Sequence, residues 1–261
     1  MDGLSISIDS PEAFDEVIYK IIFPEIYKNS WIEPLTEAHS TKKNYDFLIS
    51  NFVNKALLKF RNYSGPIFYI SKNNANISRI PFIRKSFPKA LMVAIIRDPA
   101  SHAASLLKQH KNFKLRQKRD PFILQYMNDL GHYEFGLGHK PLKFPDQTEQ
   151  TSQLVADTQT YCDLNDPNYW LDRWCDAYQY LLQQLNTTDD QFVILDFNRL
   201  ASDHDPNLDM IFEILNIPNQ TREPIDFNVD EDNVNKEMFC EQLLARAEQI
   251  KLDLLAIQQK R

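Results

Sequence analysis

The apolar run Ala90–Ile96 ends abruptly at Arg97-Asp98-Pro99, and this junction constrains the fold more than any other feature of the sequence. A continuous apolar segment of this length is typical of a buried strand in a parallel sheet. Asp98 is a residue type that caps helices and Pro99 suits the first helical position, so a helix should follow at once. The junction therefore predicts an α/β fold and places Arg97 at the carboxyl end of a strand, where open α/β sheets bind ligands.

Ser105 follows Arg97 by eight residues, about 9 Å beyond the start of the predicted helix at 1.5 Å per residue. At 100° per residue, Ser101 and Ser105 fall nearly opposite the apolar face that includes Leu107, so both serines should lie off the core. A guanidinium, a hydroxyl and free amides at a helix N-terminus form a site for phosphate. The alternative is that Arg97 pairs with an acidic neighbour and the serines are only solvated.

Arg97-Asp98-Pro99 followed by Ser105 resembles the sulfotransferase signature that binds the 3′-phosphate of PAPS (3′-phosphoadenosine 5′-phosphosulfate). The segments YWLDRWCDAYQYLL and QFVILDFNRL are similar to a later helix and strand of that family, and the resemblance extends from about Asp9 to Ile217. It implies a P-loop NTPase-like parallel sheet flanked by helices, in a single domain over residues 1–261. It also implies transfer of a sulfuryl group from PAPS to a hydroxyl or amine, with Arg97 and Ser105 binding the donor and no metal required.

The family's phosphate-binding loop, of the Pro-Lys-Ser-Gly-Thr-Thr kind, has no counterpart in this chain. None of the five glycines opens a turn rich in Lys, Ser and Thr before a helix. We therefore expect the first strand, loop and helix of the fold to be missing. Three explanations stay open: the chain is truncated, a partner polypeptide supplies these elements, or this protein has lost its activity. Two functions remain open: a sulfotransferase, or a non-catalytic protein, which is either a module that binds a 3′-phosphonucleotide or an inactive fragment of a sulfotransferase.

Three residues are candidates for the transfer step. Lys72 follows the predicted strand Ile67–Ser71 and matches the lysine of the family's Lys-Thr-His motif, which meets the sulfuryl group; Asn74 stands where the histidine base would be. His102 and Glu16 are the remaining candidates for a base. Each has a structural alternative: an exposed cation for Lys72, a half-buried polar side chain for His102, and an interaction with a helix dipole for Glu16.

Sequence periodicity and punctuation also predict the other elements. The expected helices are Ser10 to near Pro24, Asn44–Phe60, Ile80–Ser86, one from Pro121, Tyr169–Leu185, Leu208–Leu215 and Lys236–Gln259; Phe192–Asp196 is a further strand and Pro141–Asn165 a long loop.

Composition narrows the partners and the compartment. A net charge of −7 argues against general nucleic-acid binding. The three cysteines lack CxxC spacing, and neither a disulfide framework nor a metal site is expected. No apolar segment approaches the ~20 residues of a membrane span, and the start lacks the pattern of a signal peptide, which predicts a cytoplasmic protein. The acceptor stays open among a small molecule such as an alcohol, a carbohydrate, a lipid and a peptide.

Overall fold

The computed structural model of the chain describes residues 15–60, 68–144, 162–185, 191–200, 206–217 and 234–259. The helices and strands within these ranges, in chain order, are α1 (Asp15–Ile22), η1 (Pro24–Tyr27), η2 (Glu37–His39), α2 (Lys42–Phe60), η3 (Asn74–Arg79), α3 (Ile80–Ser86), β1 (Met92–Ile96), α4 (Pro99–Arg119), α5 (Pro121–Leu130), η4 (Gly136–Gly138), α7 (Pro167–Leu185), β2 (Phe192–Asp196), α8 (Phe197–Leu200), α9 (Pro206–Ile214), η5 (Lys236–Met238) and α10 (Glu241–Gln259).

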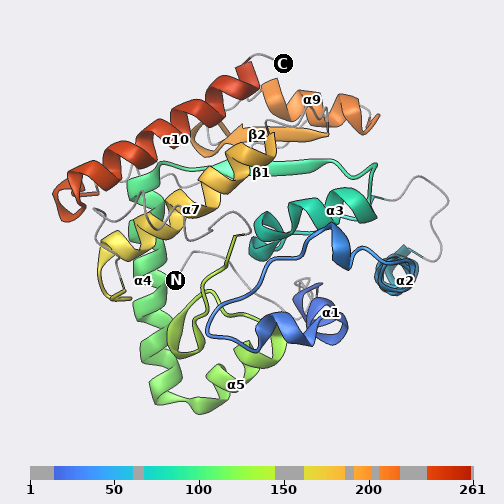
Figure 1. The fold of residues 1–261 in the computed structure, drawn as a ribbon, viewed down its shortest axis with the longest axis horizontal. Helices are drawn as coiled ribbons and strands as arrows, with labels where there is room; N and C mark the ends of the chain where they lie inside the picture. The colour runs from blue at the N-terminus through green and yellow to red at the C-terminus, as the bar shows by residue number, and fades with distance from the viewer. Residues whose placement is uncertain are drawn as a thin grey trace.

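A short parallel sheet lies within a helix-rich fold (Figure 1). β1 pairs with β2 in the register Met92↔Phe192 to Ile96↔Asp196. α7 packs against both α4 and α10, and α4 runs away from the sheet toward α5 at the opposite end of the molecule from α10 (Figure 1). The described residues therefore form a mixed fold of helices around a small parallel sheet, which is consistent with an α/β sulfotransferase-like fold.

Two apolar cores support this arrangement. The larger core joins β1 and β2 to α4, α7 and α10, with Ile96, Leu171 and Leu254 fully buried at its centre. The smaller core joins α1 and the neighbouring 3-10 helices to α2 and α3, around Leu35 and Phe82. Residues of both cores line a pocket between α4, α7 and η3, so the walls of this pocket rest on packed side chains.

The junction between β1 and α4 agrees with the prediction from sequence. The Asp98 side chain accepts a hydrogen bond from the Ser101 backbone N–H at 2.9 Å, and Pro99 occupies the first helical position. β2 has the predicted bounds, and α3 and the start of α5 are also as expected. The remaining predicted helices are present with shifted ends; the predicted start of the first, Ser10, and most of the predicted loop Pro141–Asn165 lie outside the described residues.

The prediction that β1 is a buried strand is only partly right. Ile96 is fully buried, but Val93 and Ile95 are 43% and 51% exposed, because one face of the strand packs on the larger core and the other stays open. Ser101 also differs from its prediction, since it is 7% exposed and not off the core. The reason is that Pro99, Ala100 and Ser101 are all buried in the first turn of α4, so helical periodicity does not decide which side is covered there.

The predicted strand at Ile67–Ser71 is wrong over the described residues 68–71, which have no strand conformation. Side-chain contacts hold this segment in place of a backbone ladder. The Tyr69 and Ser71 hydroxyls donate to the two oxygens of Asp15 at 2.5 and 2.6 Å, and the Tyr69 ring stacks on Phe52 at 4.4 Å. The described residues 68–71 therefore add no strand to the sheet of β1 and β2.

The part of the chain described here contains no helix with the length and apolar content needed to cross a membrane.

Candidate functional site

The corner between β1 and α4 holds Arg97, which directly follows the strand. Arg97 is half-buried, and its guanidinium carbon lies 5.4 Å from the centroid of the Phe197 ring at the end of β2. A cation over an aromatic face is attracted by the ring quadrupole, which fixes the guanidinium near the carboxyl ends of both strands. This is the edge of the sheet at which the sequence placed Arg97.

Ser105 lies two turns into α4 and is half-buried. Its hydroxyl has no hydrogen bond to the described part of the chain. His102 precedes it by three residues, and residues at this spacing are neighbours on a helix surface. Ser105 therefore has a hydroxyl available next to His102, while Arg97 lies at the start of the same helix.

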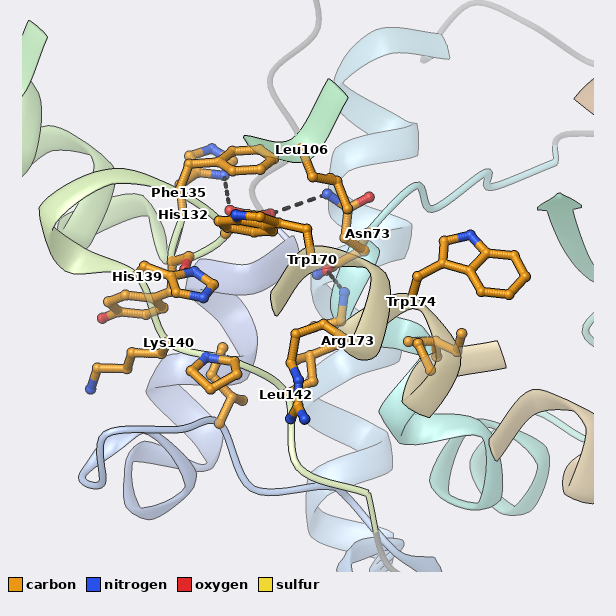
Figure 2. Close-up of a pocket in the computed structure, with 18 of the residues that line it drawn as sticks. Asn73, Leu106, His132, Phe135, His139, Lys140, Leu142, Trp170, Arg173 and Trp174 are labelled. Atoms are coloured by element: carbon orange, nitrogen blue, oxygen red, sulfur yellow. Dashed lines mark hydrogen bonds and ion pairs between the residues drawn. The ribbon is translucent and has the colours of Figure 1, made fainter. Parts of the chain in front are cut away.

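A pocket of about 370 Å³ opens between α4, α7, η3 and the segment that follows α5 (Figure 2). Three of the predicted site residues, Lys72, Glu16 and His102, line this pocket. Arg97 and Ser105 are not part of its wall. The structure thus brings the three candidates for the transfer step together and leaves the two candidates for donor binding beside them, around the N-terminal turns of α4.

One face of α7 forms a wall of the pocket that the sequence analysis did not assign to the site. Trp170, Arg173, Trp174, Ala177 and Tyr178 line the pocket at positions i, i+3, i+4, i+7 and i+8 of this helix. Figure 2 shows Trp170, Arg173 and Trp174 extending from α7, and the Phe135 and His139 rings of the segment after α5 lie against Trp170, with centroids 5.9 and 5.1 Å away. The aromatic stripe at helical spacing was the signal for this wall, although the same pattern also describes an ordinary core helix.

Glu16 is a buried carboxylate at the pocket wall, where it pairs with the fully buried Arg79. Arg79 donates two hydrogen bonds to the Glu16 carboxylate, at 2.9 and 2.7 Å. Tyr27 and Asn73 each donate another at 2.5 Å. Burial acts to raise the pKa of Glu16, but the charge of Arg79 and the four hydrogen bonds outweigh it and hold the pKa below its ordinary value. With four donors in place, this carboxylate is arranged as a structural anion.

Gly131 fits the loop after α5 against this ion pair. It has a left-handed backbone conformation with φ of 81°, and a Cβ added there would meet the Glu16 Cγ at 2.5 Å. Five residues on, the Gly136 N–H donates to His110 Nδ1 at 3.2 Å, which ties the same loop to α4. The loop therefore needs glycine at position 131 for both backbone conformation and space.

The other charged groups of the pocket are also engaged. Lys140 donates to the Tyr27 carbonyl oxygen at 2.5 Å, and Arg173 pairs with Asp172 and Asp176, each at 2.7 Å. The remaining acidic side chain, Glu134, accepts a hydrogen bond from the Asn74 amide at 3.3 Å and lies 3.7 Å from His132 Nδ1.

Lys72 differs from these groups. It is exposed and precedes η3, and it is the charged residue of the pocket to which the described part of the chain offers no hydrogen bond or ion pair. A cation without a counter-charge at the edge of a pocket attracts an anionic group.

His102 lines the pocket as a neutral imidazole. Burial, with the nearby charge of Arg97, lowers the pKa of His102 to about 4. Its Nδ1 atom is buried and has no hydrogen-bond partner within the described ranges. At neutral pH the ring therefore keeps an unprotonated nitrogen that can accept a proton.

His139, which packs against Trp170, has both ring nitrogens occupied. Nδ1 contacts the Tyr133 carbonyl oxygen at 3.1 Å, and Nε2 contacts the Tyr169 hydroxyl at 2.8 Å. In this arrangement Nδ1 carries the hydrogen and Nε2 accepts from Tyr169, so His139 has no free nitrogen for an acceptor. Groups of three or more His, Cys, Asp or Glu side chains arranged to hold a metal do not occur among the described residues.

Comparison with curated proteins and with solved structures gives no match. Residues 19–137, just under half of the chain, match the model of the Sulfotransferase family. This stretch contains the β1–α4 corner with Arg97 and Ser105, and also contains Lys72 and His102 from the pocket. The match supports placing this chain in a sulfotransferase family.

Proposed function

We propose that this protein transfers a sulfuryl group from PAPS to the hydroxyl or amine of a small-molecule acceptor, on a P-loop NTPase-like scaffold. The observation that carries the proposal is the β1–α4 corner. It puts Arg97 at the carboxyl end of a parallel strand, ahead of a capped helix that bears Ser105, inside the stretch that matches the sulfotransferase family.

Arg97 and Ser105 are the proposed ligands of the 3′-phosphate of the donor. A guanidinium can donate two parallel hydrogen bonds to a phosphate, and the Ser105 hydroxyl is available for a third. The N-terminus of α4 adds the positive end of a helix dipole. Arg97 also lies close enough to His102 to lower its pKa, so a nucleotide bound at Arg97 would adjoin the pocket.

Lys72 is the proposed contact of the sulfuryl group, because it carries the uncompensated positive charge at the edge of the pocket. The acceptor atom attacks sulfur, the bond between sulfur and the bridging oxygen breaks, and adenosine 3′,5′-bisphosphate leaves. Negative charge that develops on the sulfuryl and bridging oxygens is stabilised by the Lys72 ammonium. No metal enters this scheme.

His102 is the proposed base that takes the acceptor's proton. Of the two candidates it is the better suited, since the Glu16 carboxylate already accepts four hydrogen bonds. The imidazole is neutral at pH 7, and a polyanionic donor beside Arg97 would offset the charge that lowers the pKa of His102. The proposed location is the cytoplasm.

Binding of adenosine 3′,5′-bisphosphate tests the proposal more directly than turnover does, because the sequence predicts that the family's loop for the 5′-phosphosulfate is missing. In calorimetry, Arg97→Ala should weaken binding by about 1.5–3 kcal/mol, as loss of a charged hydrogen bond does. Arg116→Ala, which removes the same charge from an exposed position on α4, should bind like the wild type.

Adenosine 5′-monophosphate is the matched control ligand, since it lacks the 3′-phosphate. It should bind more weakly, and Arg97→Ala should not change its affinity. Equal affinity of wild type and Arg97→Ala for the bisphosphate would overturn the assignment of Arg97, and absence of bisphosphate binding to the wild type would overturn the proposed function.

A further inference from the structure

We infer that the acceptor held by this pocket is a neutral, largely apolar molecule of a few rings that presents one hydroxyl or amine. The inference rests on the proposed function, because it names the acceptor class for sulfuryl transfer at the same site. It follows from the walls of the pocket, from the state of its charged groups and from its size.

The walls of the pocket are mainly aromatic and aliphatic. From α7 come Trp170, Trp174 and Tyr178, and the Trp174 and Tyr178 rings stack with centroids 4.3 Å apart. Leu106 of α4 and Phe135 of the loop after α5 add further apolar surface. Flat ring faces at fixed positions favour a ligand with rings of its own, because stacked and edge-on ring contacts add to the gain from apolar burial.

The charged groups of the pocket disfavour a charged acceptor. A cationic acceptor needs a carboxylate, but Glu16 is paired with Arg79, and Glu134 is already engaged by the Asn74 amide and by His132, whose Nδ1 lies 3.7 Å from it. An anionic acceptor needs a cation, and Lys72, which the described chain leaves unpaired, is assigned to the sulfuryl group. A charged acceptor would therefore lose its hydration without gaining a partner, which is unfavourable.

The polar groups of the pocket also disfavour a carbohydrate. Arg173 and Lys140 already donate to groups of this chain, and both ring nitrogens of His139 are occupied. The buried pocket atoms that lack a partner within the described chain are His102 Nδ1, Trp174 Nε1 and Arg173 Nε. A sugar would bring more hydroxyls than these atoms can pair, and each buried hydroxyl left unpaired costs binding energy. A single hydroxyl directed at His102 and Lys72 avoids this cost. The carbohydrate acceptor that the sequence left open is therefore the less favourable one.

The size of the pocket sets the upper limit. At about 370 Å³ it lies near the lower end of the range for small-molecule sites, which hold compact ligands of a few rings. Ala177 lies on the α7 face that lines the pocket, so a larger side chain at this position would occupy part of the pocket volume.

Calorimetric titration with 2-naphthol, 2-naphthoate and cellobiose tests the inference on the full chain. We expect 2-naphthol to bind at least about tenfold more tightly than either of the others, a difference of 1.4 kcal/mol. Ala177→Phe should abolish 2-naphthol binding, and Ala245→Phe, the same substitution at an exposed position of α10, should preserve it.

Binding of adenosine 3′,5′-bisphosphate is measured in the same samples, so that the two proposals fail separately. Equal or tighter binding of cellobiose or 2-naphthoate, or unchanged 2-naphthol binding in Ala177→Phe, would overturn the acceptor class while bisphosphate binding leaves the proposed function standing. Loss of bisphosphate binding by Ala177→Phe would show that this variant is misfolded. The relative affinities of the wild type for 2-naphthol, 2-naphthoate and cellobiose then decide whether the acceptor class is correct. Bound 2-naphthol without any bisphosphate binding would overturn the proposed function and, with it, the acceptor role.

Discussion

The carboxylate of Glu16 and the guanidinium of Arg79 are joined by two hydrogen bonds of 2.9 and 2.7 Å, with Arg79 fully buried. The two residues lie 63 positions apart, so the contact joins α1 to the end of η3 directly at the pocket. A buried pair of this kind is costly to break, because removing one partner leaves the other charge without compensation.

Arg79→Met should therefore lower the free energy of unfolding by roughly 3–5 kcal/mol, measured by urea denaturation. The double variant Glu16→Leu/Arg79→Met should lose less than Arg79→Met alone, since it leaves no unpaired charge. Lys42→Ala breaks the exposed Lys42–Asp46 pair and should change stability by less than about 1 kcal/mol. A double variant less stable than the single one would contradict this account.

Stability should fall as the pH is lowered from about 6.5 toward 4, in part because of His110. Burial, with the charges of His139, Lys114 and Lys111, lowers the pKa of His110 to about 4, whereas an unfolded histidine titrates near 6.5. Between these values the unfolded state binds more protons, so the free energy of unfolding rises with pH. The contribution is complete above pH 6.5, and about 2 kcal/mol of it is lost by pH 5, at 1.36 kcal/mol per pH unit.

His110→Gln isolates this contribution, because glutamine can accept the Gly136 N–H hydrogen bond and does not titrate. Denaturation curves at pH 7.5 and pH 5 should show a smaller loss of stability in His110→Gln than in the wild type. His102→Gln should reduce the loss in the same way, since the pKa of His102 is also about 4. Identical losses in all three proteins would contradict the assignment to these histidines.

Arg97 and Ser105 should act as a unit if they bind the same phosphate. Ser105→Ala alone should weaken binding of adenosine 3′,5′-bisphosphate by about 1 kcal/mol, as for an ordinary hydrogen bond. In the double variant Arg97→Ala/Ser105→Ala the two losses should fail to add by at least about 0.5 kcal/mol. Strictly additive losses in calorimetry would place the two side chains in independent sites.

Substitution of Lys72 should change the affinity for the donor PAPS and not the affinity for its product, adenosine 3′,5′-bisphosphate. The proposed contact is with the sulfuryl group, so Lys72→Met should weaken binding of PAPS by roughly 1 kcal/mol and leave adenosine 3′,5′-bisphosphate unaffected. Lys85→Met, which removes an exposed lysine outside the pocket, is the matched control and should change neither affinity. An equal loss for both ligands would assign Lys72 to the nucleotide instead.

The β1–α4 corner could be predicted from the sequence because its causes are local. An apolar run, a capping aspartate and a proline at the first helical position lie within ten residues of one another. The strand predicted at Ile67–Ser71 failed for the opposite reason. Its hydroxyl groups bond to Asp15, which is 54 residues from Tyr69 and 56 from Ser71 and carries no signal that links it to them.

The pocket also depends on contacts that span long stretches of sequence. Glu16 could be recognised as a candidate carboxylate, but its pairing with Arg79 required the fold. The face of α7 that carries Trp170 and Trp174 has a regular helical pattern in the sequence, yet that pattern cannot tell a pocket wall from a packed core. His102 could be selected because it lies on α4, which the sequence does specify. Lys72 was selected by resemblance to the family's Lys-Thr-His motif, at the end of a strand that the described residues 68–71 do not form.

Gly131 makes the two sides of the pocket differ in how freely they can change during evolution. Any side chain at this position would collide with Glu16 and disturb its ion pair with Arg79, so sequence drift in the loop is limited by folding. Positions such as Ala177 on the α7 wall carry no such restriction of backbone conformation or ion pairing. Relatives with other substrates should therefore diverge on the helical wall and keep the glycine, which makes α7 the place to redesign selectivity.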